Sequence, residues 1–260
     1  MHPSDATSAP GFLPLSSAAA ASVGPGPLRH VVTTGSTNTD LADEARRGDR
    51  SGAVLVTDHQ TAGRGRLDRV WEDVPGTALL VSLRVPIAGT DGGPVVRALG
   101  AAARAAVDGL CHDPVVAKWP NDLVVVDGAA PGKLAGVLAE FVAGDQPCVV
   151  IGIGINIRPV ADLPGATSVV ECGGPDDRDR LLAALLTEFA PRRRDGTGVI
   201  DELRAHSATL GSRVRIELPG GTHLVGTATD LTEAGELVVR TDDGASRVVA
   251  TGDVVHVRPG

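Results

Sequence analysis

The sequence predicts an α/β (α+β) fold in which a mixed sheet flanked by helices is followed by a small antiparallel β-barrel. From His30 to about Ala208, short aliphatic runs typical of strands alternate with amphipathic or alanine-rich segments typical of helices. Beyond Leu210, stretches of alternating apolar residues are separated by glycine-rich turns. This second pattern indicates a barrel of about five strands.

These changes in composition divide the chain into three parts. The first residues are rich in Ala, Ser, Pro and Gly and lack helical periodicity, which predicts a disordered leader. The expected organisation is a leader at 1–28, a main domain at 29–208 and a barrel domain at 211–260.

Aliphatic runs define the expected strands of the main domain, which are 31–32, 53–57, 77–85, 115–118, 123–126, 134–141 and 148–153. The fourth and fifth of these strands are expected to pair antiparallel. Helices are expected at 39–47, 94–110, 178–189 and 199–208. Thr37 or Asn38 is expected to cap the first helix. In the barrel, strands are expected around 214–218, 224–225, 237–239, 248–249 and 254–257.

Charge and cysteine usage limit the functional classes. A net charge of −8 argues against broad non-specific binding to nucleic acid or to anionic membranes. Cys111, Cys148 and Cys172 are widely spaced, so we expect buried thiols in a reducing compartment rather than disulfides or a zinc site. No apolar run reaches membrane-spanning length and the N-terminus lacks a charged signal-peptide region, which favours a cytoplasmic protein.

The chain holds only two lysines, Lys118 and Lys133, and both lie in motifs rich in Gly or Pro. Arginine cannot replace lysine where a compact ammonium must approach one cluster of oxygens. Both lysines are therefore candidates for chemistry, and the alternative is a compositional bias that left two lysines by chance.

A segment that alternates glycine with arginine follows the strand at 53–57. It runs from Gln60 through Gly63, Arg64, Gly65 and Arg66 and continues to Arg69 and Trp71. Glycines let a backbone wrap a ligand, and guanidinium groups suit carboxylates and phosphates. We therefore predict a loop that grips an anion. An RNA-binding arginine tail is the alternative, which the absence of repetition disfavours. The two tryptophans, Trp71 and Trp119, are expected either to stack on a ligand or to lie in the core.

The segment 118–122 combines Lys118 with Asn121 and Asp122 across a turn set by Pro120. An ammonium, an amide and a carboxylate this close suit phosphate, ribose and magnesium. The alternative is an ordinary Asn–Asp turn beside a surface lysine.

The segment 132–136 resembles a nucleotide-binding P-loop only superficially, because its spacing differs and Leu134 follows Lys133. Lys133 instead begins a strand that contains Gly136. A second strand contains Gly152 and Gly154 and leads to Asn156. Glycines inside strands leave room for a flat ligand or for another backbone.

Taken in order, the motifs at 36–38, 60–66, 118–122, 133–136 and 152–156 resemble those of the biotin protein ligases, which activate biotin with ATP and attach it to carrier domains of carboxylases. The resemblance runs from about His30 to the C-terminus and implies a class II synthetase-like catalytic domain followed by an SH3-like barrel. Bifunctional members also carry an N-terminal helix-turn-helix. We expect that motif, and DNA binding with it, to be absent here, because the leader is too short and irregular.

The resemblance also implies roles for individual residues. Biotin would be bound by Ser36, Thr37, Asn38, Gln60, Gly63, Arg64, Arg66, Lys133, Gly136, Gly152 and Gly154. ATP would be bound by Arg64, Arg66, Arg69, Trp71, Lys118, Asn121 and Asn156.

Lys133, Arg66 and Asp122 would be catalytic, with Asp122 either a Mg²⁺ ligand or a base for the acceptor lysine. The implied partner is a biotin carboxyl carrier protein or domain. The alternatives are a lipoate-type ligase of the same fold and a nucleic-acid-binding regulator that uses the arginine loop.

Overall fold

The computed structural model describes residues 28–256 except 49–52, 68, 161–162 and 219–220. The expected disordered leader therefore lies outside the described residues, apart from Leu28, which begins the first strand.

A seven-stranded mixed sheet forms the centre of the main domain, in the order β1-β2-β3-β7-β6-β5-β4. Its strands are β1 (Leu28–Thr34), β2 (Ala53–Gln60), β3 (Ala78–Pro86), β4 (Val115–Lys118), β5 (Asp122–Val125), β6 (Gly132–Val142) and β7 (Cys148–Asn156). Only β1 and β2 pair in parallel, and the other neighbours are antiparallel. The predicted mixed sheet and the predicted β4–β5 pair are both confirmed.

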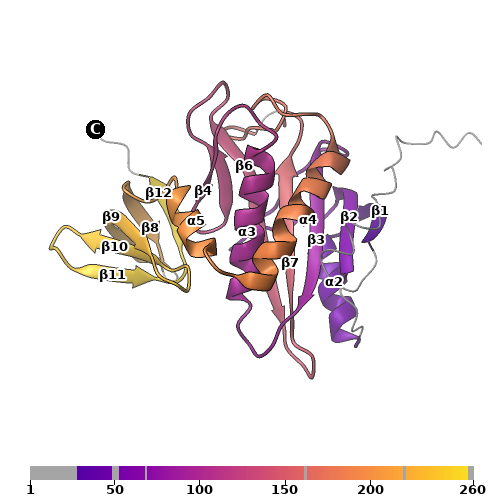
Figure 1. Cartoon of the computed structure of the whole chain (residues 1–260), viewed down its shortest axis with the longest axis horizontal. Coiled ribbons are helices and arrows are strands. Elements are labelled where there is room, and N and C mark those ends of the chain that lie inside the picture. The colour runs from indigo at the N-terminus through magenta and orange to yellow at the C-terminus, as the bar shows by residue number, and fades with distance from the viewer. Residues whose placement is uncertain (1–27, 49–52, 68, 161–162, 219–220, 257–260) are drawn as a thin grey trace, which may run out of the picture.

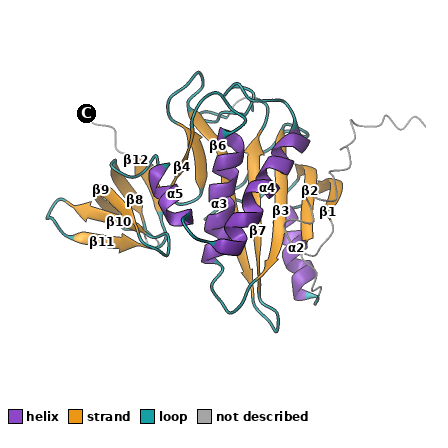
Figure 2. Ribbon diagram, in the orientation of Figure 1, coloured by secondary structure: helices purple, strands orange, loops and turns teal. Residues whose placement is uncertain are grey.

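Helices cover both faces of this sheet (Figure 2). They are α2 (Thr37–Arg46), α3 (Gly93–Asp108), α4 (Arg178–Asp195) and α5 (Val199–Ala205). Successive residues of a strand face opposite sides. In β7, Val149 and Ile151 accordingly join the core beneath α3 and α4, whereas Val150 packs with Leu41 of α2 on the other face.

The C-terminal part is a separate five-stranded antiparallel sheet in the order β11-β10-β9-β8-β12. Its strands are β8 (Arg213–Glu217), β9 (His223–Leu231), β10 (Leu237–Thr241), β11 (Ser246–Val249) and β12 (Asp253–His256). It lies beside α5 and β4, far from β1 (Figure 1). Within the described residues the edge strands β11 and β12 do not pair with each other. The five antiparallel strands are thus confirmed, and closure into a barrel stays a prediction.

The predicted helix boundaries were wrong by one or two residues for α3 (Gly93–Asp108) and by more in α4 and α5, and the start and N-cap of α2 also differ. α2 begins at Thr37 rather than residue 39, and its N-cap position is Ser36 instead of Thr37 or Asn38. α5 ends at Ala205 because the following backbone pairs with β4, where Ala117 N donates to His206 O and Ala208 N donates to Ala117 O. α4 continues through Pro191 to Asp195, and the Arg192 guanidinium anchors that extra turn by donating to the Glu188 carbonyl oxygen.

All three cysteines are free thiols; Cys148 and Cys172 are buried, as predicted, whereas Cys111 is only part-buried. Burial raises the pKa of the Cys111 thiol to about 12, with Cys172 adding to the effect, so this thiol stays protonated at neutral pH. No described helix is both long and apolar enough to cross a bilayer.

A part-buried charge network ties α3, α4 and α5 together. Glu202 of α5 accepts hydrogen bonds from Arg104 of α3 at 3.1 Å and from Arg192 of α4 at 2.9 Å. Burial alone would raise the pKa of the Glu202 carboxyl. The hydrogen bonds and charges of the two arginines outweigh it, so the pKa lies below its ordinary value of 4.5.

Replacing Glu202 with Gln should lower the free energy of unfolding at pH 7 by about 1–3 kcal/mol, because two part-buried guanidinium groups lose their carboxylate. A carboxyl whose folded pKa is lowered stabilises the protein above its unfolded pKa, and this contribution disappears as the pH falls through the folded pKa. The difference between wild type and Glu202→Gln should therefore shrink below pH 4.5.

Urea unfolding at pH 7 and at acidic pH measures this difference. The control is Glu233→Gln, which alters an ion pair of Arg204 whose carboxylate is 85% exposed and should change stability little. A loss for Glu202→Gln that is equally large at both pH values would contradict the assignment.

Candidate active site

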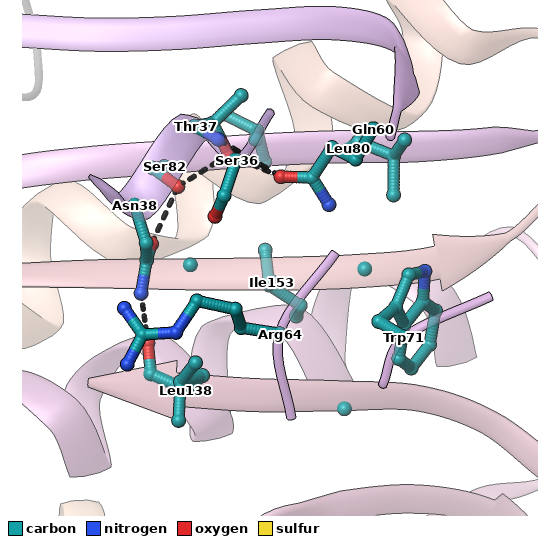
Figure 3. A pocket seen from close by; sticks show the side chains of 14 residues that line it. Ser36, Thr37, Asn38, Gln60, Arg64, Trp71, Leu80, Ser82, Leu138 and Ile153 are labelled. Atoms are coloured by element: carbon teal, nitrogen blue, oxygen red, sulfur yellow. Dashed lines mark hydrogen bonds between the residues drawn. The ribbon is translucent and has the colours of Figure 1, made fainter. Parts of the chain in front are cut away.

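The floor of the candidate site is built by β3, β7 and β6 on the face of the sheet that α2 covers. Strand pairing places the floor residues in two rows across the sheet, Leu80, Gly154 and Gly136 in one and Ser82, Gly152 and Leu138 in the other. Because glycine has no side chain, the middle strand leaves a depression between its neighbours (Figure 3). Gly136, Gly152 and Gly154 thus line one pocket.

The first turn of α2 and the end of β2 form a polar wall above this floor. Thr37 N donates to Gln60 Oε1 at 2.9 Å, and the Thr37 hydroxyl oxygen lies 2.7 Å from Ser82 Oγ. Ser82 Oγ donates to Asn38 Oδ1 at 2.6 Å. These contacts form one continuous chain in Figure 3. They explain why neither Thr37 nor Asn38 caps α2, since both side chains bond within the pocket.

Ser36 occupies the N-cap position of α2, but its hydroxyl makes no capping bond. The residue is buried and lines the pocket together with Thr37, Asn38 and Gln60. Its hydroxyl is therefore placed to bond a ligand.

Trp71 covers the row that contains Gly154. A Cβ atom at Gly154 would lie 2.5 Å from Cε2 of the indole, and one at Gly136 would lie 3.1 Å from Cζ3. The free space that remains is about 30 Å³, enough for little more than a water molecule. The indole Nε1 is buried without a hydrogen-bond partner among the described residues. The ring thus fills the pocket, and a bicyclic ligand needs it to move.

The arginine loop, whose described residues are 61–67 and 69–71, folds over the pocket as a short hairpin. Trp71 N donates to Gly63 O at 3.0 Å, and Gly65 N donates to Arg69 O at 2.7 Å. Gly63 has to be glycine because a side chain there would overlap the backbone of Trp71.

Segments that are distant in sequence bind the three arginines of this loop. Arg64 pairs with Glu140 at 2.7 Å, and Arg69 pairs with Asp253 of β12. Arg66 donates to Asn121 Oδ1 and to Thr251 Oγ1, at 3.2 Å in each case.

Burial lowers the pKa of the Arg66 guanidinium, although the charges of Asp253 and Asp122 raise it again in part. Carboxylates and carbonyl oxygens of the protein therefore occupy the sites where an anionic ligand would bind these arginines.

Two larger cavities adjoin the pocket. One, of about 340 Å³, is lined by Arg64, Arg66, Arg69, Trp71, Lys118, Asn121, Asp122, Lys133, Glu217 and Asp253. The other, of about 260 Å³, lies among Trp71, Lys133, Asn156 and residues 163–166.

Lys133 borders both cavities. Its Nζ lies 2.8 Å from Asp122 Oδ1 and 5.8 Å from the centre of the Trp71 ring. Apart from Gly63, which lies in the hairpin, the binding and catalytic residues predicted from sequence all line the pocket or one of these two cavities.

Trp119 lines the larger cavity beside Lys118 and is fixed there by the C-terminal sheet. Its indole packs against the core of the C-terminal sheet, and Nε1 donates to Gly235 O at 3.0 Å. The peptide between Trp119 and Pro120 is cis. The turn that presents Asn121 and Asp122 is therefore anchored to the C-terminal sheet.

Asn156 also uses its amide internally, because Nδ2 donates to Thr167 O at 3.0 Å. Among the residues that the structure describes, no group of three or more His, Cys, Asp or Glu side chains is placed to hold a metal ion by itself.

Sequence reasoning missed Ser82, Glu140, Thr251 and Asp253. Ser82 carried a signal, since it is a polar residue within an otherwise aliphatic stretch of β3. The other three are surface-type residues whose positions depend on contacts made far along the chain, and nothing local distinguished them.

Two family models match this chain. Residues 32–156 match the biotin/lipoate A/B protein ligase family, and residues 209–257 match the biotin protein ligase C-terminal domain. The solved structure of the *Aquifex aeolicus* biotin protein ligase in complex with biotin and ATP has the same fold, with a TM-score of 0.71 and 24% identity over 89% of this chain and 99% of that one.

Curated relatives agree with the family models. The biotin–[acetyl-CoA-carboxylase] ligase of *Mycobacterium tuberculosis* is 40% identical over 88% of both chains. The bifunctional ligase/repressor BirA of *Bacillus subtilis* is 31% identical over 82% of this chain and 69% of its own length. The chain belongs to the biotin protein ligases, within the biotin/lipoate A/B protein ligase family, and is a biotin ligase enzyme.

Gly154→Ala should push the Trp71 indole off the floor, because the new methyl group would overlap the ring. The expected result, in a Trp119→Phe background that leaves Trp71 as the only tryptophan, is red-shifted emission and stronger quenching by acrylamide. The control is Gly100→Ala, since a Cβ at Gly100 meets nothing within 4 Å. Unchanged Trp71 emission in a folded Gly154→Ala protein would show that the ring does not rest on this glycine.

Proposed function

We propose that this enzyme forms biotinyl-5′-AMP from biotin and ATP and then transfers biotin to a lysine of a biotin carboxyl carrier domain. The observation that supports this most is the position of Lys133, at the junction of the glycine-floored pocket and two cavities large enough for parts of a nucleotide. The relative from *M. tuberculosis* is named for an acetyl-CoA carboxylase, so a carboxylase carrier is the proposed acceptor class.

The first step joins the ligands that these sites would hold. A carboxylate oxygen of biotin attacks the α-phosphorus of ATP, a new oxygen–phosphorus bond forms, and the bond to the β-phosphate oxygen breaks with release of pyrophosphate. In the second step the neutral amine of the acceptor lysine attacks the acyl carbon. An amide forms, AMP leaves, and the amine gives up a proton.

The position of each residue indicates which part of the ligands it would bind. Ser36, Thr37, Asn38 and Gln60 would bind the polar ring of biotin above Gly136, Gly152 and Gly154. Lys133 would leave Asp122 and place its ammonium where the biotin carboxylate meets the α-phosphate. A positive charge preorganised at reacting oxygens contributes several kcal/mol to lowering a barrier.

Arg64, Arg66 and Arg69, with Gly63 at the base of their loop, would exchange their protein partners for the ligand anions. Lys118, Asn121, Trp71 and Asn156 would complete the nucleotide site.

Asp122 and Asn121 fit a magnesium ion bound together with ATP. Mg²⁺ in nucleotide sites is held by one or two protein oxygens and by substrate phosphates, and both side chains present oxygen to the larger cavity beside Lys133. When bound, the ion would neutralise phosphate charge. The alternative role of Asp122, as a base for the acceptor amine, uses the same oxygen atoms.

The domain organisation belongs to this proposal. A catalytic domain at 29–208 of class II synthetase-like architecture would be followed by an SH3-like unit at 211–260. The second unit would complete the active site, because Thr251 and Asp253 contact the arginine loop.

A lipoate-type ligase is the second candidate, since the matched family includes lipoate ligases. Release of pyrophosphate with biotin, with lipoate or with neither ligand separates the two. Release only with biotin supports the proposal, and release only with lipoate overturns it.

Lys133→Arg should reduce biotinyl-AMP formation by at least about 100-fold while the protein stays folded, because a planar guanidinium cannot reproduce a compact charge at converging oxygens. Single-turnover adenylation, with circular dichroism as the folding check, measures this. Arg47→Lys, a swap of the same two residue types at the exposed end of α2, is the matched control. Near-normal adenylation by a folded Lys133→Arg protein would contradict the role.

Arg66→Gly should release the reactive adenylate before transfer, because Arg66 links the loop to Asn121 and to Thr251. The expected readout is biotin on lysines of a bystander protein, measured by mass spectrometry. Arg47→Gly, at the exposed C-cap of α2, should not increase this labelling. Bystander labelling no greater than that of wild type would count against retention by Arg66.

A further inference from the structure

Ser82 is an exception in its surroundings. It lies in β3 between Val81 and Leu83, in a strand whose residues are almost all buried and aliphatic, and its own exposure is 0%. Burial of a hydroxyl group costs free energy unless the group is hydrogen-bonded. The hydrogen-bond partners of Ser82 therefore indicate its role.

The orientation of the Asn38 side chain determines which atom donates in the hydrogen bond between Ser82 and Asn38. Its amide contacts the Leu138 carbonyl oxygen at 3.1 Å, and a carbonyl oxygen only accepts, so Nδ2 faces Leu138. Asn38 Oδ1 then faces Ser82 Oγ at 2.6 Å and has to accept its proton.

The bond from Ser82 to Asn38 determines the direction of the bond between Thr37 and Ser82. Because Ser82 has a single hydroxyl proton and gives it to Asn38, Ser82 Oγ can only accept from Thr37 Oγ1 at 2.7 Å. The proton of Thr37 is then used as well. The remaining contact, 3.1 Å from Thr37 Oγ1 to Gln60 Oε1, is the longest of the three oxygen–oxygen contacts and carries no proton. Gln60 Oε1 is held instead by Thr37 N.

We propose that Ser82 is a positioning residue that turns Thr37 Oγ1 and Asn38 Oδ1 into two fixed hydrogen-bond acceptors facing the pocket. With both protons committed to Ser82 and Asn38, each of these oxygen atoms offers a ligand a lone pair. The site then selects a ring that carries N–H donors, such as a cyclic urea, over a ring that carries none. This inference rests on the proposed function, in which biotin is the ligand, and Ser82, whose own exposure is 0%, acts through Thr37 and Asn38.

Removal of the Ser82 hydroxyl should release both protons. In Ser82→Ala, Thr37 Oγ1 has no acceptor in β3, so its proton can turn to Gln60 Oε1 or toward the pocket, while Asn38 Oδ1 loses its donor. A ligand N–H would then meet a hydroxyl that can rotate and an amide held only by its bond to the Leu138 carbonyl oxygen. Ser82→Thr retains the hydroxyl and should retain the order of the bonds.

The experiment measures ligand affinity of the full chain by calorimetry without ATP, for biotin and for the two biotins methylated at one ureido nitrogen. Ser82→Ala should weaken biotin binding about 10- to 100-fold, the range expected when a buried acceptor network loses its donor. It should weaken binding of at least one N-methyl analogue much less, because that analogue lacks the N–H that would donate to Thr37 Oγ1 or Asn38 Oδ1.

Kinetics provide a second readout. The KM for biotin should rise in parallel with the dissociation constant, while kcat and the KM for ATP stay unchanged. Ser82→Thr should remain within about threefold of wild type in affinity. Ser168→Ala removes another hydroxyl at 0% exposure, away from the pocket, and should not change biotin affinity.

Each outcome decides the matter. If Ser82→Ala binds biotin as tightly as wild type, or loses the same factor for biotin and both N-methyl analogues, Ser82 only packs and the inference is overturned. If wild type binds biotin and its analogues but releases no pyrophosphate with ATP, the proposed function fails while the inference about the pocket stands on its affinities. If wild type does not bind biotin at all, both fail.

Discussion

The register of β3, β7 and β6 is the constraint on which the rest of the site depends. It aligns Gly154 with Gly136, so two adjacent strands lack side chains at the same level of the sheet. A shift of one residue would turn these positions to the opposite face and place isoleucine side chains in the pocket. Because the floor is open at this level, the Trp71 indole can lie directly on the backbone. The arginine loop ends at Trp71, so the position of this ring sets the closed position of the loop. The register of the sheet beneath the ring therefore determines where the loop closes.

Closure of the loop depends on contacts that are individually weak. Arg64 and Arg69 are about half or more exposed, at 48% and 67% of their side-chain area, and exposed ion pairs contribute little to stability. Leu67 and Val70 of the same loop are also largely exposed. A loop held in this way can open at small cost and can exchange Glu140 and Asp253 for a ligand that carries more charge. The C-terminal sheet takes part directly, because it supplies Asp253 and Thr251.

Much of the fold could be predicted from sequence because strands and long helices leave local patterns. The aliphatic runs located the seven strands of the main domain, and the glycines of β6 and β7 marked the pocket. Propensity could not choose the N-cap of α2, because Ser36, Thr37 and Asn38 all favour a cap position. Ser36 takes that position, and tertiary contacts with Ser82 and Leu138 use the side chains of Thr37 and Asn38. The end of α5 was wrong for a similar reason, since pairing of 206–208 with β4 ends the helix.

The partners of the arginine loop were beyond prediction because they are so distant. Arg66 and Thr251 are 185 residues apart, and no local pattern in either segment indicates the contact. The motif predicted a loop that binds anions, but only the folded chain shows that carboxylates of the protein pair with Arg64 and Arg69. Ser82 could be predicted only in part. Its polarity in an apolar strand was visible in the sequence, but its hydrogen-bond partners were not.

Hydrogen exchange of the arginine loop in the full chain tests most directly whether the loop arginines replace their protein carboxylates with ligand anions. Backbone amides of residues 63–71 are followed by mass spectrometry without ligand, with biotin, and with biotin plus ATP. The account predicts rapid exchange without ligand, because Trp71 has to leave the pocket before biotin can enter and the loop is weakly held. It predicts strong protection once biotin and ATP replace the protein carboxylates. Equal protection of these amides with and without both ligands would contradict it, whatever activity the enzyme shows.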